Sequence, residues 1–469
     1  MDNFIVWIDP TGAKKFAQFF RVNVRCVLAD GIWNEDNSDE DWSPDFDFEA
    51  APARLADDWS AEFRIPRATL RLPHPTPEKL NFIVFRNQPS ETRIRTTNVV
   101  LGREPACFLC VAEALTGLRD LPKTSGLTVT PYAAVNSSRT RIGEHSSSEA
   151  KFSADADIKW RPSPEWALDA TFRPDFSQLE PDTPQLKSNA RFALSVQEKR
   201  PFFLEGSDLF STPYNLIYTR SITDPLWGAR STYRSENIDA TVLTVSDRGG
   251  GFVILPGSYY SDARNQDASQ STFARVRVPF AKGESSGSFG ALLSDRTYDD
   301  DTTNRAVSVD GLFRPNNESR LRAQVLASGT DDRVLKAKGD GHAAYVNGSF
   351  DDGVNHAWLS VASISPKFRS DNSIVTQNGY DAVKFETWRC FKRESFFNDV
   401  CLGLFGSKTR ASNGEALGWY VTPSIYANGN RNSEWSLQPR WINYARAQEG
   451  SRWHHTPTLH AKGEGNTGG

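Results

Sequence analysis

Residues 167–172 read ALDATF, and the two faces of this stretch differ in chemistry. In an extended chain Leu168, Ala170 and Phe172 share one face, while Asp169 and Thr171 share the other. Alternation with a period of two is typical of a β-strand that has one apolar and one polar side. The same pattern recurs in residues 154–160, 238–245, 306–313, 320–328, 355–364 and 417–426. The sequence therefore predicts a long antiparallel meander from about residue 123 onward.

A closed up-and-down β-barrel is the fold that we expect for this meander. So long a sheet would otherwise expose its edge strands, and closure removes them. A propeller or a stack of sandwiches would show a repeat of about 40–50 residues or several separate cores. Neither is visible. At roughly 20–24 residues per strand with its connection, about 14–16 strands would fit. Periodicity alone leaves a membrane barrel and a large soluble β protein both open.

Composition excludes two broad classes of protein. The 469 residues include 54 Lys and Arg against 58 Asp and Glu, a net charge of −4, which provides no basic surface for nucleic acid. Mean hydropathy is −0.52, and the absence of any run of 18 apolar residues argues against a bundle of membrane helices. Strands that alternate between lipid and lumen have a similarly low mean hydropathy. We expect no nucleic-acid partner.

Residues 1–122 differ from the rest of the chain. The runs FIVWID, FFRVNV, WSAEFRIP and LNFIVFRN have the length of strands, and acidic or proline-rich loops separate them. A small antiparallel β-sandwich is the economical fold for this part. The loop that follows the second run is dense in carboxylates, which is typical of a solvated loop, with a cation site as the alternative.

Residues 173–222 interrupt the strand pattern and are dense in charge, proline and phenylalanine. Residues 198–206 read EKRPFFLEG, residues 174–178 read PDFSQ, and residues 218–220 read YTR. These motifs resemble the signature of a family of bacterial outer-membrane barrel proteins of unknown function. Members of that family carry a family-nine-like carbohydrate-binding module ahead of the barrel. GLTVTPY at residues 126–132 looks like the first barrel strand of that family, and WSAE at residues 59–62 looks like part of the module.

The resemblance implies an all-β chain in three parts. Residues 1–122 would be a partial family-nine-like carbohydrate-binding sandwich, and residues 123–446 a large up-and-down antiparallel transmembrane β-barrel. The polar residues 447–469 have no strand signal and predict a disordered tail. The implied location is the bacterial outer membrane, in contact with its lipid, with the module in the periplasm. The resemblance leads us to expect a truncated member, because the sequence shows no signal-peptide pattern and no counterpart of the first module strands, and Gln197 replaces an expected proline.

The charged segment at residues 173–222 suits the interior of a barrel, because irregular backbone at membrane depth is tolerated only where protein or water satisfies it. Arginine forks could then pair with carboxylates. Such a network could brace the wall, act as a plug or gate that selects solutes, or supply a catalytic carboxylate pair. The residues that we assign to this network are Asp175, Glu180, Asp182, Glu198, Lys199, Arg200, Glu205, Asp208 and Arg220.

Sugar recognition in the first part would need flat aromatic faces and planar polar groups. Trp33 and Trp42, in or beside the acidic loop, are candidates, as are Trp59 and the guanidinium of Arg86. Core packing is the alternative role for each tryptophan, and for Trp59 in particular. Carbohydrate is therefore a possible partner of the module.

The remaining candidate sites are weak. Cys107 and Cys110 have the spacing of half a zinc site, but without a second half we interpret them as small buried apolar residues. Cys390 and Cys401 flank a hairpin and could pair if oxidised.

Two functions stay open at this point. One is an outer-membrane barrel in envelope transport or glycan binding. The other is a soluble carbohydrate-active enzyme, an O-glycosyl hydrolase. The chain has no recognisable catalytic constellation or cofactor motif, so enzyme activity is undecided and we expect neither a cofactor nor a metal site.

Overall fold

The structure, a computed structural model, describes most of residues 2–466. The positions outside the described part are 1, 11, 13, 15, 36–38, 43–45, 57, 67–68, 71–78, 89–93, 102–106, 118–126, 143–144, 164, 174–197, 199, 205, 236, 284, 393–396, 430–433, 450–451, 461–462 and 467–469. The described chain is almost entirely β-strand, which confirms the predicted all-β class. No helix in this part of the chain is long and apolar enough to cross a membrane.

The N-terminal module, residues 2–117, is built on one seven-stranded antiparallel sheet with the order β4-β3-β2-β1-β7-β8 and with β9 paired to β7. Its strands are β1 (Asn3–Asp9), β2 (Phe16–Asn23), β3 (Leu28–Asn34), β4 (Asp39–Asp41), β7 (Lys79–Gln88), β8 (Ile94–Thr97) and β9 (Glu113–Thr116). The hairpin of β5 (Glu49–Arg54) and β6 (Trp59–Arg64) packs over the face that carries Ile8 and Phe20. Trp7 and Phe19 fill the opposite face under the short helix η1 (Leu109–Val111). Both faces of the sheet are therefore covered, as a sandwich requires.

Most of the remaining described chain forms an 18-stranded antiparallel sheet that follows chain order. The strands of this large sheet are β10 (Leu127–Ile142), β11 (His145–Trp160), β12 (Trp166–Phe172), β13 (Pro225–Arg234), β14 (Asp239–Asp247), β17 (Ser269–Lys282), β18 (Ser285–Tyr298), β19 (Thr303–Arg314), β20 (Ser319–Asp332), β21 (Ala337–Asp351), β22 (Asn355–Ile364), β23 (Tyr380–Lys392), β24 (Phe397–Ala411), β25 (Ala416–Gly429), β26 (Glu434–Leu437), β27 (Arg440–Glu449), β28 (Arg452–His460) and β29 (Gly463–Asn466). The predicted up-and-down meander is confirmed.

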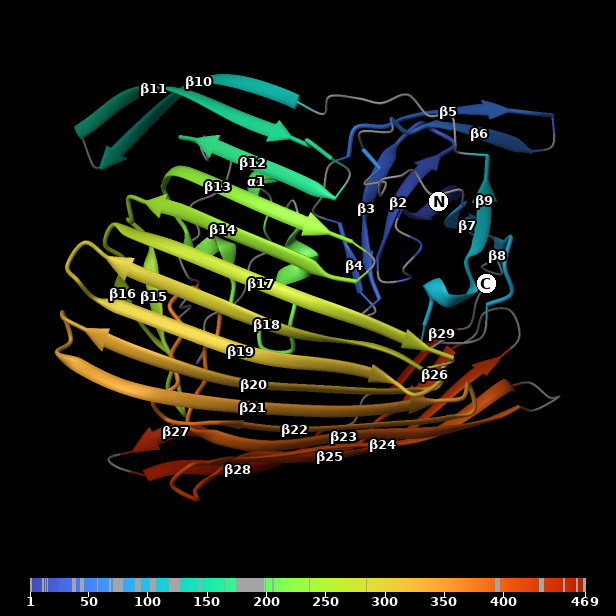
Figure 1. Ribbon diagram of the computed structural model, residues 1–469. Helices are drawn as coiled ribbons and strands as arrows, with labels where there is room; N and C mark the ends of the chain where they lie inside the picture. The colour runs from blue at the N-terminus through green and yellow to red at the C-terminus, as the bar shows by residue number, and fades with distance from the viewer. Residues whose placement is uncertain are drawn as a thin grey trace.

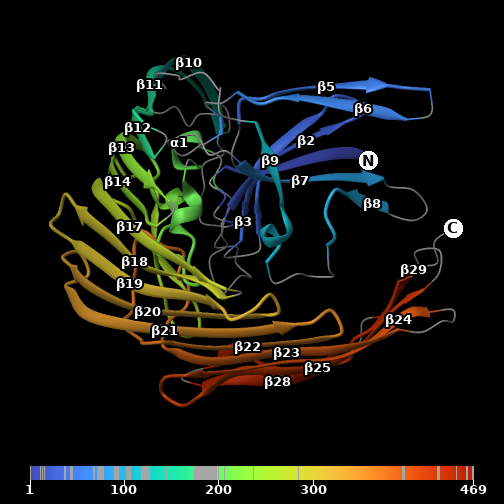
Figure 2. The ribbon, with the colours of Figure 1, turned by 45° about the vertical axis from the view of Figure 1, so that its right-hand side comes forward.

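The large sheet curls into a trough with the N-terminal module on its concave side (Figures 1 and 2). We expected a closed barrel, but among the described residues β10 pairs with β11 and has no register with β25–β29. The meander also loses its regularity at its end, because β25 pairs with both the four-residue β26 and β27. Strands β28 and β29 lie within residues 447–469, where the sequence predicts no strand.

The two ends of the trough have different connections. At one end, short turns at residues 235–238, 315–318 and 352–354 join successive strands. At the other end, short turns at residues 299–302, 333–336 and 412–415 lie beside three long connections, residues 173–224, 248–268 and 365–379. The second of these connections contains the hairpin of β15 (Phe252–Leu255) and β16 (Asp262–Asn265). The module lies at the short-turn end, which is the right-hand end in Figure 1.

The two faces of the large sheet have opposite chemistry. The convex face of β18–β20 carries exposed apolar side chains, with Phe289, Val309 and Val325 each 63% exposed. Alternate positions point to the concave face, where Arg275, Arg296 and many other polar residues are buried. The period-two pattern of the sequence therefore places apolar side chains on the convex face and charged side chains on the concave face.

Candidate functional site

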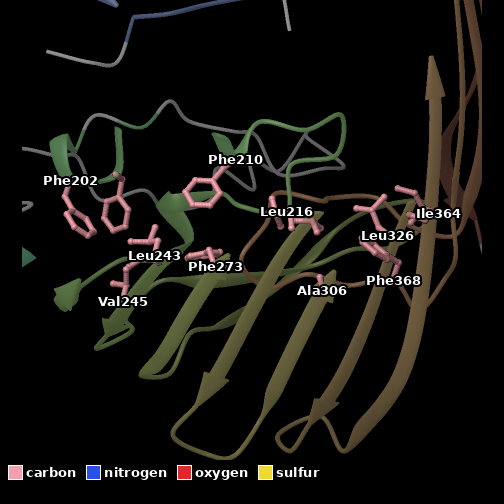
Figure 3. Packing of buried hydrophobic residues seen from close by; sticks show 14 residues of the cluster. Phe202, Phe210, Leu216, Leu243, Val245, Phe273, Ala306, Leu326, Ile364 and Phe368 are labelled. Atoms are coloured by element: carbon pink, nitrogen blue, oxygen red, sulfur yellow. The ribbon is translucent and has the colours of Figure 1, made fainter. Parts of the chain in front are cut away.

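The concave face is occupied by residues 198–224, here called the inward segment. It contains α1 (Pro201–Leu204), η2 (Ser207–Phe210) and η3 (Thr219–Ser221). Figure 3 shows Phe202, Phe210 and Leu216 of this segment over strand residues such as Leu243 and Phe273. The ring of Phe202 lies directly on Gly228 of β13, where a Cβ would come within 2.8 Å of Cε1. The inward segment thus packs closely against the concave face of the large sheet.

Glu198 and Arg200 fasten one end of the inward segment. Their side chains form a forked ion pair, with Arg200 Nε and Nη2 each 2.7 Å from a Glu198 oxygen. Arg200 also donates to the carbonyl oxygens of Thr219, at 2.6 Å, and Ile222, at 2.7 Å, and the Thr219 hydroxyl donates to Glu198. With Arg200 buried and both charges paired, this group joins the start of the inward segment to residues 219–222 near its end.

Further ion pairs join the inward segment to the strands. Asp208 in η2 accepts a hydrogen bond from Arg234 at the end of β13, at 2.5 Å. Arg275 on β17 donates to the carbonyl oxygen of Leu209 and pairs with Asp310 on β19. The guanidinium groups therefore hold both the backbone of the segment and the carboxylates of the wall.

Arg296 on β18 is the most deeply buried charge of this interface, with no exposed surface. Its guanidinium donates to the carbonyl oxygens of Ser221 and Asp371 and lies 3.4 Å from Asp247. Asp371 belongs to the connection of residues 365–379, which also folds inward: the amide of Tyr218 donates to the Asn372 carbonyl oxygen at 2.6 Å. Two long connections therefore meet on the concave face and share one arginine.

The structure describes only part of the predicted charge network. Glu198, Arg200 and Asp208 lie on the concave side in ion pairs, and Arg220 lies in η3. Glu198 pairs with Arg200, and Asp208 pairs with Arg234 of the wall. The predicted members that lie outside the described residues are Asp175, Glu180, Asp182, Lys199 and Glu205.

The strand arginines are the residues that sequence reasoning missed. Arg275, Arg277 and Arg296 occupy concave positions of β17 and β18, and Arg277 pairs with Asp239 at 3.0 Å. A signal was present for Arg275 and Arg277, because both alternate with the apolar residues Ala274, Val276 and Val278. Arg296 lies between Asp295 and Thr297 and has no such signal. Their partners lie on other strands or in loops, which the sequence does not pair.

The predicted sugar-binding residues of the module fall on two opposite faces of its sheet. Trp33 packs edge-on against Trp7 and donates to Glu35 at 2.7 Å. Trp42 lies on the same face against Phe19, is 39% exposed, and has the Arg21 guanidinium 4.5 Å above its ring.

The other two candidates lie together on the far face. Trp59 is buried and donates to Asp2 at 3.0 Å, and Arg86 pairs with Asp2 at 3.0 Å and with Asp58 at 2.7 Å. The pairing holds the pKa of Asp2 below its usual value of 3.8: burial acts to raise it, and the bonds from Arg86 and Trp59 outweigh that effect. No single site unites the four residues, and sugar binding stays a prediction.

Glu35 links the module internally and to the large sheet. Its buried carboxylate accepts the backbone N–H groups of Phe108 and Leu109, at 2.9 and 3.1 Å. Burial raises the pKa of this carboxyl above its usual range. Its carbonyl oxygen accepts a bond of 2.5 Å from Arg314 at the end of β19. The module is therefore seated on the short-turn end of the trough.

Cysteine pairing differs in part from expectation. Cys390 and Cys401 form a disulfide across β23 and β24, as the hairpin spacing allowed. Cys107 and Cys110 also form a disulfide, whereas the sequence suggested two small buried apolar residues. Cys26 is free and exposed. Within the described part of the chain, no cluster of His, Cys, Asp and Glu could hold a metal ion.

With this geometry in place, known proteins provide one family match. Residues 124–246 match the family described as Domain of unknown function (DUF5916). The match includes the EKRPFFLEG motif and the inward segment. A comparison with curated proteins gives no match.

Solved structures provide only distant likenesses. The Pseudomonas aeruginosa protein OccK11 (OpdR) has a TM-score of 0.34 at 8% identity, over 95% of this chain and 91% of that one. Acinetobacter baumannii OccAB2 has a TM-score of 0.34 at 9% identity, over 99% and 96%. The outer membrane protein opdK from Pseudomonas aeruginosa has 0.31 at 8%, over 99% and 98%. Scores this low do not establish a common fold.

Proposed function

We propose that this chain is an outer-membrane β-barrel protein that passes polar solutes across the envelope, with the inward segment as a plug or gate. One observation carries the proposal: the convex face of the large sheet is apolar and exposed, while arginines and carboxylates pair on the concave face. Exposure of such an apolar face to water is unfavourable for a soluble protein, whereas a wall that faces lipid requires an apolar surface.

The connections support an orientation for the proposed barrel. Outer-membrane barrels have short periplasmic turns and longer extracellular loops. The module contacts the short-turn end through Arg234, whose guanidinium lies 4.9 Å from the Phe16 ring, and through Arg314. The module would then be periplasmic. Its tryptophans, above all the exposed Trp42, keep glycan binding as a proposed role of this module.

The proposal requires that the sheet be closed in the membrane, because lipid cannot satisfy the backbone groups of an open edge. The test is to express the full chain behind a secretory signal in a Gram-negative host and fractionate the envelope. We expect the protein in the outer membrane, and we expect its band on SDS gels to shift on boiling, since a closed barrel resists unfolding by SDS. A soluble protein with no heat-dependent shift would refute the proposal.

Solute passage is measured separately, as current through single channels in planar bilayers. The control is protein boiled before reconstitution, which should give no current. A heat-modifiable protein that yields no conductance and no solute uptake would retain the barrel and overturn the transport role.

A further inference from the structure

A cavity of about 560 Å³ opens on the concave wall of β21–β25, away from the inward segment and the arginine pairs described above. Its lining includes Asp351, Glu386, Trp388, Phe405, Tyr426 and Asn428. This volume lies within the range of small-molecule sites, about 300–1,000 Å³. The disulfide between Cys390 and Cys401 forms part of the wall.

Strand register explains why these side chains converge. Glu386 on β23 lies opposite Phe405 on β24, and Cys401 on β24 lies opposite Tyr426 on β25. Trp388 follows Glu386 by two residues and therefore shares its face. Convex neighbours such as Leu402 and Ile425 are apolar and exposed. The cavity is thus built by the concave positions of β23, β24 and β25, together with Asp351 of β21 and Gly353 of the turn that follows it.

The charge of the cavity is negative. Two carboxylates line it, those of Asp351 and Glu386, and the described residues of its lining include no lysine or arginine. Asp351 lies 2.8 Å from Nδ1 of His356, which compensates its charge only when that ring is protonated. Lys384, on the same face of β23, is not part of the lining. An anionic solute would be repelled here, and a cation would be attracted.

The aromatic rings suit a cation with an apolar body. Trp388 stacks on His356 with ring centroids 3.6 Å apart, which fixes the indole, and Phe405 lies 6.3 Å from it. Tyr426 lines the same cavity. Indole, phenol and phenyl faces attract alkylammonium groups through their quadrupoles, and the attraction grows when the ion is shielded from water.

We propose that this cavity binds small organic cations of the alkylammonium class, with Glu386 as the counter-ion and Trp388, Phe405 and Tyr426 as the aromatic walls. The inference deepens the proposed function, on which it rests for its role in transport, by naming the class of solute that the wall selects. The binding event itself does not depend on conduction.

The test is calorimetric titration of the detergent-solubilised full chain with choline, with its neutral isostere 3,3-dimethylbutan-1-ol, and with maltose. We expect choline to bind at least about tenfold more tightly than the neutral isostere, because only choline has the charge. Choline binding should weaken as salt is raised, since the attraction is partly screened. Maltose should give no heat of binding.

Two variants locate the site. Glu386→Gln should weaken choline binding about tenfold, and Trp388→Leu should weaken it by a similar factor. Glu318→Gln is the matched control, because Glu318 is an exposed residue in the 315–318 turn outside the cavity, and it should bind choline as the unaltered chain does. A heat shift on SDS gels shows that each variant is folded.

Equal affinity for choline and its isostere, maltose binding in place of choline, or unchanged choline affinity in folded Glu386→Gln would each overturn the inference. Failure of the proposed function gives a different result. A chain that binds choline but carries no current would keep the cation site and refute transport, whereas a conducting chain without choline binding would refute the site alone.

Discussion

At the scale of residues, the structure is held by buried arginines whose partners come from distant parts of the chain. Arg296 joins β18 to Ser221 in η3 and to Asp371 in the connection at residues 365–379. Breaking a buried ion pair strongly destabilises the fold, because the remaining partner is left as a buried charge without a counter-ion or water. The surface pair of Arg305 and Asp295 offers a contrast, since Arg305 is 65% exposed.

We predict that Arg296→Met lowers the free energy of unfolding by about 3–5 kcal/mol, because it leaves Asp247 without its cation. Urea unfolding in lipid vesicles, followed by tryptophan fluorescence, measures the change. Arg305→Met is the matched control and should cost at most about 1 kcal/mol. Equal losses of the free energy of unfolding for the two substitutions would contradict the larger contribution to stability that we assign to Arg296.

The Asp2–Arg86 pair predicts a pH dependence for the module. The folded pKa of Asp2 lies below its usual value of 3.8, so its carboxylate adds stability above that pH, and this stability is lost as pH falls through the folded pKa. Near-UV circular dichroism of the tryptophans, recorded during unfolding between pH 7 and pH 2, follows this loss. Arg86→Leu should be less stable at pH 7 and show a flatter acid profile. If Arg86→Leu leaves the pH dependence of stability unchanged, the Asp2–Arg86 pair is not its source.

At the scale of elements, the inward segment and the wall are fitted to each other rather than merely close. A glycine at residue 228 allows the Phe202 ring to lie against β13, and Thr171 of β12 lies 3.3 Å from the same missing Cβ. The cluster below it combines apolar residues of the segment and of strands β14–β22. The plug is therefore seated by packing as well as by ion pairs.

We predict that Gly228→Val displaces α1 from the wall, because its added atoms overlap the Phe202 ring, at a cost of about 1–3 kcal/mol. Limited trypsin digestion followed by mass spectrometry should then show faster cleavage after Arg220, which is followed by Ser221. Gly348→Val on β21 is the control, since a Cβ there meets nothing within 4 Å. Cleavage rates that match those of the unaltered chain would show that the contact does not seat the segment.

At the scale of the whole molecule, the module lies at the short-turn end of the trough, and the long connections lie at the other end (Figure 2). This arrangement determines which surfaces would face the periplasm. The module contacts β13 and β19 through Arg234 and Arg314, which lie beside the turns at residues 235–238 and 315–318.

The proposed orientation predicts which positions can be labelled on intact cells. In a Cys26→Ser background, Val334→Cys should react with a membrane-impermeant maleimide, because Val334 is 57% exposed at the long-connection end. Asn317→Cys, in a turn at the module end, should react only after the outer membrane is permeabilised. The reverse pattern would place the module outside the cell.

The sequence by itself determined the all-β class, the antiparallel meander and the position of the segment that interrupts it, because strand alternation and the EKRPFFLEG motif are local patterns. It also separated the polar face from the apolar face of each strand. Only the tertiary structure decided that Arg296 meets Asp371, that Trp59 and Arg86 lie on the face opposite Trp33, and that Glu386 and Trp388 share a cavity with Tyr426. These contacts depend on strand register and on where long connections return, and neither is encoded within a few neighbouring residues.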